Sequence, residues 1–324
     1  MGFRRNHVRN MYEKDLTRTW RAGRASVAGI WVTLLLACTP PDRPARLPEP
    51  LPEDLLAYLE ADSISARFLH DGLSYHFVWS EKGPWAVHVL RLELERCDLG
   101  LRVLPAGELG LYGAGLATVT ELVGEAGAGV LAAVNGDFFT PEGRPLGSEV
   151  AAGQILWSRE RPALEWTPGR APWIGTVQRE GSGLSAGIWV SRSGPGRTQV
   201  IGGFPELLDA GHPVVNDDAD SDQGFTSVRH PRTGVAYDPE ARRLWVMVVD
   251  GRQGSYSSGM TLAEMTAALS ATGAAEALNL DGGGSSVMVV DGRMMSRPSD
   301  DDGERAVRNA LALVSDPTFC QVAP

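Results

Sequence analysis

The C-terminal third of the chain constrains the fold most, because its apolar residues change from strand spacing to helix spacing and back. Apolar runs at 244–249 and 277–280 have the length of strands, and residues 262–272 between them place apolar side chains on one helical face. Thr261 and Glu264 have the spacing of a capping box, which marks the start of that helix. The pattern therefore predicts a βαβ unit.

The rest of the chain favours short strands joined by tight turns. It contains 38 Gly and 21 Pro in 324 residues, a composition that suits turns better than long helices. Residues 85–95 alternate apolar and charged side chains, which predicts an outer-sheet strand with one solvent-exposed face. Residues 118–121 open a short helix, and Asp291-Gly292 predicts a hairpin turn. Further strands are expected at 130–134, 287–290, from Met294 onward and at 306–314. We expect an α+β fold with mixed β-sheets, a C-terminal βαβ unit and few short helices.

The N-terminal residues have the layout of an export signal. Six arginines precede an apolar run at 27–37, which ends in Leu35-Leu36-Ala37-Cys38. That ending resembles the bacterial lipobox, in which the cysteine becomes lipidated. The run is shorter than the roughly 20 residues that a membrane-spanning helix needs, so a lipid on Cys38 is favoured over a spanning anchor. We expect a protein that is exported and lipid-anchored in the bacterial cell envelope, on the periplasmic or outer-membrane face.

The sequence divides into four expected parts. Residues 1–37 are interpreted as a lipoprotein signal peptide, and residues 38–53 as a Pro-rich tether. Residues 54–115 form a strand-rich segment without a recognisable motif, and residues 116–316 carry the candidate catalytic domain.

Composition and missing motifs exclude several classes of function. A net charge of -10 without a basic stripe argues against a nucleic-acid partner. The sequence lacks the motifs of P-loop nucleotide hydrolases, dinucleotide-binding folds, zincins and α/β-hydrolases, and it has no Cys/His cluster for zinc. The run 217–224 resembles a calcium loop with a misplaced glycine, so we interpret it as a solvated acidic loop that could bind structural calcium incidentally. Cys97 and Cys320 would remain after export, either paired or as buried free thiols.

The segment 279–286 is the most informative part of the chain for function. Three successive glycines allow the backbone to approach a ligand closely and to point its N–H groups at an anion. Asp281 supplies a carboxylate directly before them. The substrate-binding positions expected in this segment are Asn279, Gly282, Gly283, Gly284 and Ser285.

Other polar residues stand beside glycine at strand ends. Asp250 and Arg252 follow the first strand of the βαβ unit and would open on the same sheet edge as Asp281. Arg232 can grip a phosphate or carboxylate with two hydrogen bonds, and Glu304 adds a carboxylate that could act as a general acid. Additional binding candidates are Asn135, Asp137, Thr233 and Arg305. We expect six of these residues to converge on one site: Asn135, Arg232, Asp250, Asn279, Asp281 and Glu304.

The order of these motifs resembles the phosphodiester glycosidase family, the family of N-acetylglucosamine-1-phosphodiester α-N-acetylglucosaminidase. The resemblance spans about 116–314 and is carried by segments 133–139, 231–235, 249–252, 259–262, 277–285 and 304–311. The chain departs from the family pattern at Asp137, where the family usually has glycine, and at Gly234-Val235-Ala236, where it usually has Ala-Ile-Gly. We interpret Asp137 as either an additional acid in the site or a turn residue.

The resemblance implies hydrolysis of the glycosidic C–O bond of a sugar-1-phosphate diester in an envelope or extracellular glycan, with no required cofactor or metal. It implies that Arg232, Arg252 and the glycine amides hold the phosphate, while carboxylates stabilise positive charge on the sugar. The expected catalytic carboxylates are Asp281, Asp250 and Glu304. Two alternatives stay open: a non-catalytic envelope lipoprotein that binds anionic glycans, and a metal-dependent phosphodiesterase that cleaves the P–O bond.

Overall fold

A computed structural model describes residues 47–107, 115–176, 197–214 and 223–321, which belong to one compact unit. The expected signal peptide, the expected lipidation site Cys38, most of the expected tether and residues 217–222 of the acidic run lie outside these ranges. No helix within the described ranges is long and apolar enough to cross a membrane.

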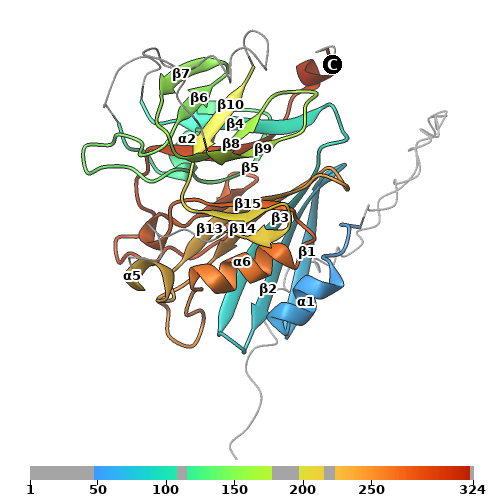
Figure 1. Cartoon of the computed structure of the whole chain (residues 1–324), viewed down its shortest axis with the longest axis vertical. Helices are drawn as coiled ribbons and strands as arrows, with labels where there is room; N and C mark the ends of the chain where they lie inside the picture. The colour runs from blue at the N-terminus through green and yellow to red at the C-terminus, as the bar shows by residue number, and fades with distance from the viewer. Residues whose placement is uncertain (1–46, 108–114, 177–196, 215–222, 322–324) are drawn as a thin grey trace, which may run out of the picture. The chain divides into compact units, whose positions relative to one another are not determined.

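Three β-sheets form most of the unit (Figure 1). The largest has eight strands in the order β1 (Ser63–His70), β2 (Leu73–Ser80), β3 (Trp85–Glu93), β14 (Arg243–Val249), β13 (Arg232–Asp238), β15 (Glu276–Asn279), β11 (Glu206–Asp209) and β12 (His212–Pro213). A second sheet has five strands in the order β17 (Arg293–Met294), β16 (Met288–Val290), β5 (Val130–Asn135), β18 (Asn309–Ser315) and β4 (Leu99–Pro105). The third sheet also has five, in the order β7 (Gln154–Trp157), β6 (Glu149–Ala151), β10 (Gln199–Gly202), β8 (Pro162–Trp166) and β9 (Trp173–Thr176).

The helices are few and short, which together with the sheets confirms the predicted α+β class. Within the described ranges they are α1 (Glu53–Leu59), α2 (Val119–Ala126), α5 (Gln223–Thr226) and α6 (Leu262–Ser270), with 3₁₀ turns η1 (Gly283–Ser285) and η2 (Pro317–Gln321). Both expected capping boxes are present: Thr118 with Glu121 opens α2, and Thr261 with Glu264 opens α6. The predicted hairpin turn also forms, with positive φ at Asp291 and the next residue.

The predicted βαβ unit has an unexpected sheet order. β14, α6 and β15 follow one another as expected, but β13 lies between the two strands and pairs with both of them in antiparallel fashion. The two strands therefore run parallel to each other without being neighbours, which is a split βαβ arrangement. All strand pairings in the described ranges are antiparallel. The consequence for function is that β13 begins at the sheet edge where β14 and β15 end.

The strand predicted at 85–95 exists as β3, but its expected position in an outer sheet is wrong. β3 lies in the middle of the eight-stranded sheet, and its residues are buried on both faces. Leu90 belongs to the core on one face, while Val89 belongs to the core beneath α1 and α6 on the other. The charged side chain that suggested exposure, Arg91, is only 8% exposed because Glu49 and Glu93 pair with it.

Two apolar cores flank the large sheet. One fills the space between it and the two smaller sheets, and the other lies between it and helices α1 and α6. Along β14 the side chains alternate between them, since Val246 faces the first core and Trp245 and Met247 face the second. Burial of both faces fixes the register of the central strands, and with it the place where each strand ends.

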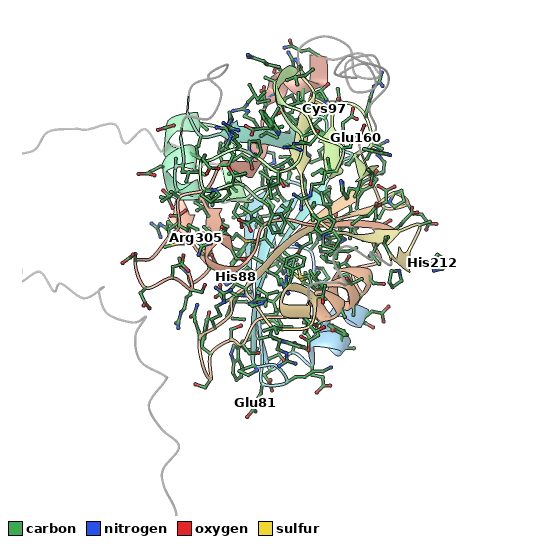
Figure 2. The ribbon with its side chains drawn as sticks, turned by 60° about the vertical axis from the view of Figure 1, so that its left-hand side comes forward. Glu81, His88, Cys97, Glu160, His212 and Arg305 are labelled. Carbon is green, nitrogen blue, oxygen red and sulfur yellow. A yellow bond between two sulfur atoms is a disulfide. The ribbon has the colours of Figure 1, made fainter. Side chains whose placement is uncertain are left out.

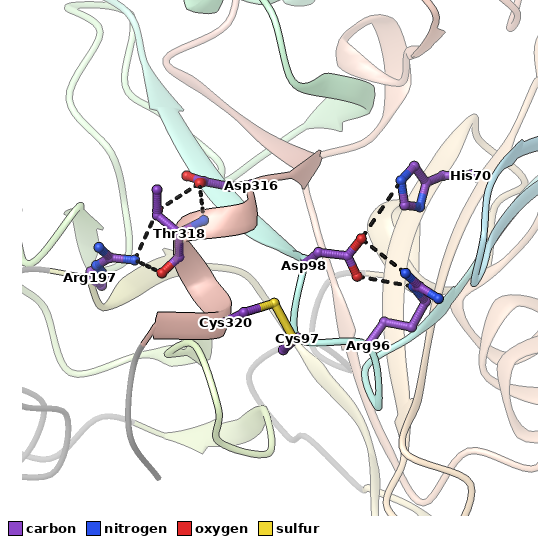
Figure 3. Close-up of a disulfide and its surroundings, with 8 residues drawn as sticks. All are labelled: His70, Arg96, Cys97, Asp98, Arg197, Asp316, Thr318 and Cys320. Carbon is purple, nitrogen blue, oxygen red and sulfur yellow. Dashed lines mark hydrogen bonds and ion pairs between the residues drawn. A yellow bond between two sulfur atoms is a disulfide. The ribbon is translucent and has the colours of Figure 1, made fainter.

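Cys97 and Cys320 form a disulfide, which settles the choice between a pair and two free thiols (Figure 3). The bond joins the loop before β4 to the 3₁₀ turn η2 after β18. Arg96 and Asp98 form an ion pair beside it, with 3.0 Å between Nε and Oδ1. Since β4 and β18 are paired strands, the disulfide fastens two segments that the sheet already holds together.

Candidate active site

Three chain segments meet where β15 ends and β13 begins. The backbone N–H of Leu280 donates to the Thr233 carbonyl at 2.9 Å, and that of Asp281 donates to the Gly136 carbonyl at 2.9 Å. The N–H of Gly283 donates to the Pro231 carbonyl, also at 2.9 Å. These bonds bring the end of β5, the start of β13 and the glycine loop together, as the sequence predicted for strand ends in different parts of the chain.

Two buried asparagines tie these segments to one another. Asn135 donates from Nδ2 to the Asp281 carbonyl at 2.7 Å, and its Oδ1 accepts a hydrogen bond of 2.7 Å from the Thr233 hydroxyl. Asn279 donates from Nδ2 to the carbonyl oxygens of Phe204 and Leu280, both at 2.8 Å. Both asparagines are completely buried, so these amide groups hold the loops in position.

Asp281 is the partly exposed carboxylate of the cluster. Its Oδ1 accepts a hydrogen bond of 2.8 Å from the N–H of Gly282. Burial raises the pKa of Asp281 to about 6, although the Ser285 hydroxyl, the Gly282 amide and the positive charge of Arg305 act in the opposite direction. A carboxylate with a raised pKa beside a flexible-backbone loop is typical of a functional position.

Asp137 is a second carboxyl group in the same cluster and is almost fully buried. Gly147 donates its N–H to Oδ2, whereas Oδ1 is buried without a hydrogen-bond partner. Burial raises the pKa of Asp137 to about 7, and the negative charge of Asp281 adds to the rise, while Arg161 opposes it. A Cβ on Gly202 would lie 2.6 Å from Oδ2, so the surrounding glycines make room for this side chain.

Arg232 is a buried guanidinium group at the start of β13. It donates from Nε to the Met260 carbonyl at 2.9 Å and from Nη2 to the carbonyls of Phe225 and Val228. No ion pair among the described residues includes it. Burial, together with the positive charge of Arg252, lowers the pKa of Arg232 to about 10. Arg232 is 1% exposed and bonded to backbone carbonyls, so it contributes buried positive charge, whereas the neighbouring Arg252 is exposed and can meet an anion directly.

The three glycines support this pair of arginines in a different way from the predicted one. The N–H groups of Gly282 and Gly283 are used inside the protein, by the Asp281 carboxylate and the Pro231 carbonyl. The expected hollow of three free amides is therefore wrong, because the loop turns back on its own neighbours. Gly283 has φ +61°, and a Cβ there would lie 3.3 Å from Nη2 of Arg252. The missing side chain allows this guanidinium to lie against the loop.

Asp250 lies at the same sheet edge but is occupied by structural partners. Its Oδ2 is 3.2 Å from Nε2 of His88 and accepts a hydrogen bond of 3.2 Å from the Tyr256 hydroxyl. Its Oδ1 accepts a hydrogen bond of 2.9 Å from the N–H of Arg297. His88 lies in the interior of the unit, and Nδ1 of its ring is 2.8 Å from the Tyr75 hydroxyl (Figure 2). A carboxylate that is 1% exposed and bonded in this way orients its neighbours rather than meeting a substrate.

Glu304 and its neighbour Arg305 have different surroundings. The Glu304 carboxylate accepts a hydrogen bond of 3.0 Å from the N–H of Thr120 in the first turn of α2. This placement follows from the attraction between a carboxylate and the N-terminus of a helix. Arg305 is exposed, as Figure 2 shows, and its Nε donates to Asp300 at 2.7 Å. The ion pair of Arg305 and Asp300 lies against Gly284.

Unsatisfied buried polar atoms gather around the glycine loop. Among the described residues, buried side-chain oxygen atoms of Asp137, Asn279 and Ser286 lack a hydrogen-bond partner. Such atoms are rare in folded proteins, and each one calls for an explanation such as a ligand. Their concentration here marks the cluster as the candidate active site.

The sequence matches the family model of the phosphodiester glycosidases over residues 128–314, more than half of the chain. The chain belongs to the phosphodiester glycosidase family. No curated protein matches the sequence. The family match contains the candidate active site in full, from Asn135 to Arg305.

Solved structures share the fold of this chain at low sequence identity. A protein from Synechocystis has a TM-score of 0.60 at 18% identity, and the match covers 79% of this chain but only 64% of that one. A Burkholderia pseudomallei K96243 protein described as exported has a TM-score of 0.55 at 21% identity, over 72% of this chain and 74% of that one. The catalytic domain of zebrafish N-acetylglucosamine-1-phosphodiester α-N-acetylglucosaminidase, auto-inhibited by its pro-peptide, has a TM-score of 0.59 at 20% identity, over 78% and 84%.

Several residues of this candidate site were not predicted from the sequence. Arg161 precedes β8 and faces Asp137, and Phe138 and Phe204 surround it. Asn309 accepts a hydrogen bond of 2.9 Å from the N–H of Asp137. Asn309 could be identified from the sequence, because it follows an arginine at the start of an apolar strand. Nothing in the sequence near Arg161 marks that residue as functional. Within the described ranges no three His, Cys, Asp or Glu side chains come close enough to hold a metal ion.

Proposed function

We propose that this chain hydrolyses the glycosidic C–O bond of a sugar-1-phosphate diester at the cluster around Asp281. Membership of the phosphodiester glycosidase family supports this reaction class. The observation that carries the proposal is the exposed guanidinium of Arg252, which lies against the loop of Asp281, with the buried positive charge of Arg232 next to it and a carboxylate of raised pKa in the same loop. The guanidinium groups can bind the anionic phosphate, and the Asp281 carboxylate can stabilise the positive charge that develops on the sugar.

In the proposed reaction the bond between the anomeric carbon and the phosphate oxygen breaks. Its electrons remain on the departing phosphate monoester, which gains a second negative charge, while a water molecule supplies the new hydroxyl group of the sugar and releases its other proton to the solvent. Arg252 contacts the phosphate and stabilises the charge that develops on it, and the buried positive charge of Arg232 adds to this from behind, so the leaving group needs no protonation. Asp281 provides negative charge for the oxocarbenium-like transition state. Asp250 holds the adjacent strand end through its buried hydrogen bonds.

The proposed location is the bacterial cell envelope, with a lipid on Cys38. The basic leader, the short apolar run and Leu35-Leu36-Ala37-Cys38 support export and anchoring. The disulfide between Cys97 and Cys320 fits an oxidising compartment outside the cytoplasm. The substrate would then be an envelope or extracellular glycan, or a phosphate-linked decoration of one.

A panel of sugar-1-phosphate diesters, incubated with the protein in ¹⁸O-labelled water, tests the reaction. We expect free sugar that carries the label, because C–O cleavage adds the water oxygen to the anomeric carbon. Asp281→Asn should abolish release while the melting temperature stays near that of the unchanged protein. Label on the phosphate would mean P–O cleavage, the phosphodiesterase alternative. Binding of every diester without turnover would support the glycan-binding alternative.

A further inference from the structure

A partly buried arginine, Arg161, stands directly before β8 beside the Asp137 carboxyl group. Its Cζ lies 4.7 Å from the centre of the Phe204 ring and 5.6 Å from that of Phe138, over both rings. The attraction between Arg161 and Asp137 acts on the titration of both groups. Two aromatic rings and one carboxyl group therefore hold the guanidinium next to the candidate active site.

The positive charge of Arg161 has no ion-pair partner among the described residues. Asp137 is a weak counter-charge, because burial raises the pKa of Asp137 to about 7 and keeps the group protonated in slightly acidic solution. Aromatic ring faces attract a cation but offer its N–H groups no oxygen to bind. Arg161 thus has hydrogen-bonding capacity that the described protein does not use.

The scissile phosphate does not account for this third arginine. A phosphodiester carries one negative charge, and Arg232 and Arg252 already supply two positive charges beside the Asp281 loop. The ring of Phe225 contacts Phe138 edge-on, with 6.0 Å between the ring centres, and Arg232 lies over it at 5.2 Å. Successive contacts with the rings of Phe138 and Phe225 thus connect Arg161 to Arg232, and the two guanidinium groups lie over different rings. The positive charge of Arg161 would therefore fit an anionic group of the substrate other than the scissile phosphate.

Building on the proposed function, we propose that Arg161 binds a carboxylate on the sugar, so that the substrate is a uronic acid 1-phosphate diester. The planar guanidinium fork matches a carboxylate with two parallel hydrogen bonds. Phe138 and Phe204 are partly exposed and can cover apolar faces of the sugar ring. Asp137 acts as a positioning residue that keeps Arg161 at the edge of the site.

The test compares two methyl phosphodiesters, of glucose-1-phosphate and of glucuronic acid 1-phosphate, each as both anomers at pH 6. We expect kcat/KM to be about 10-fold or more higher for the uronic acid, the range expected of a charge-assisted contact. Arg161→Gln should bring the ratio of the two values close to one. Arg159→Gln removes the same charge from an exposed position two residues away and should leave both values unchanged. Equal values in the unchanged protein, or a ratio that Arg161→Gln does not alter, would overturn the inference.

Calorimetric binding separates this inference from the proposed reaction. Glucuronic acid 1-phosphate should bind more tightly than glucose 1-phosphate, and Arg161→Gln should remove the difference. If neither diester is hydrolysed but this difference is found, the hydrolytic function fails and the carboxylate site stands. Equal affinities of the two sugar phosphates would overturn the carboxylate site whether or not hydrolysis occurs.

Discussion

Substitution of Gly283 by alanine tests how the glycine loop supports the phosphate-binding arginines. Its φ of +61° is a left-handed conformation, which costs a residue with a side chain about 1–2 kcal/mol. The new methyl group would also lie 3.3 Å from Nη2 and 3.4 Å from Nη1 of Arg252, close enough that the guanidinium must move by a few tenths of an ångström. We expect Gly283→Ala to lower the free energy of unfolding by about 1–2 kcal/mol and to displace Arg252.

Gly292→Ala is a matched control for the backbone effect. Gly292 has φ +69°, and no atom lies within 4 Å of the position that its Cβ would take. The two variants should therefore lose similar stability in urea unfolding, while only Gly283→Ala should lose activity. If displacement costs Arg252 a charge-assisted hydrogen bond to the phosphate, worth about 1.5–3 kcal/mol, kcat/KM falls about 10- to 100-fold.

Both variants must be assayed at a temperature where unfolding measurements show them folded. Near-normal kcat/KM in Gly283→Ala would refute the argument that the loop holds Arg252 against the substrate. A similar loss of activity in both variants would assign the effect to stability, and the contact with Arg252 would then carry no function.

Three further outcomes follow from the buried groups. Burial raises the pKa of Asp281 to about 6 and that of Asp137 to about 7, so the folded protein binds more protons than the unfolded chain between about pH 4 and 7. The free energy of unfolding should fall as the pH rises through this window, and Asp137→Asn should reduce that fall in urea titrations at pH 4, 6 and 8. Replacing Cys97 and Cys320 by serine should lower the free energy of unfolding by about 2–4 kcal/mol, and a reducing agent should do the same to the unchanged protein only. Asp250→Asn should lower the melting temperature, because its carboxylate is bonded inside the protein; lost activity at an unchanged melting temperature would instead indicate direct catalysis.

The parts of the fold that the sequence predicted are those with local signals. The capping boxes at Thr118 and Thr261 each use a partner three residues away, and the hairpin turn at Asp291 depends on two adjacent residues. Such signals need no knowledge of the rest of the chain. The order of strands in the sheet has no local signal, and the insertion of β13 between β14 and β15 was accordingly not predicted.

The misjudged strand β3 illustrates the limit of periodicity. Alternating apolar and charged residues normally indicate one exposed face, and Arg91 supplied part of that pattern. In the folded chain the side chain is covered, because Glu49 and Glu93 neutralise it and the carbonyl of Pro50 accepts a hydrogen bond from it. The segment at Glu49 and Pro50, about 41 residues before Arg91 in the chain, thus contributes to the burial of this charged side chain.

The difference between local signals and contacts with distant residues also explains which candidate carboxylates could be identified from the sequence. Asp250 and Asp281 both follow a buried strand and precede glycine, so the sequence treats them alike. Asp250 is occupied by His88, which lies 162 residues away, and by Arg297, which lies 47 residues away. Asp281 takes its hydrogen bond from the adjacent Gly282 and keeps an exposed surface. A local motif can therefore place a carboxylate at a sheet edge, but only distant partners decide whether it remains available to a substrate.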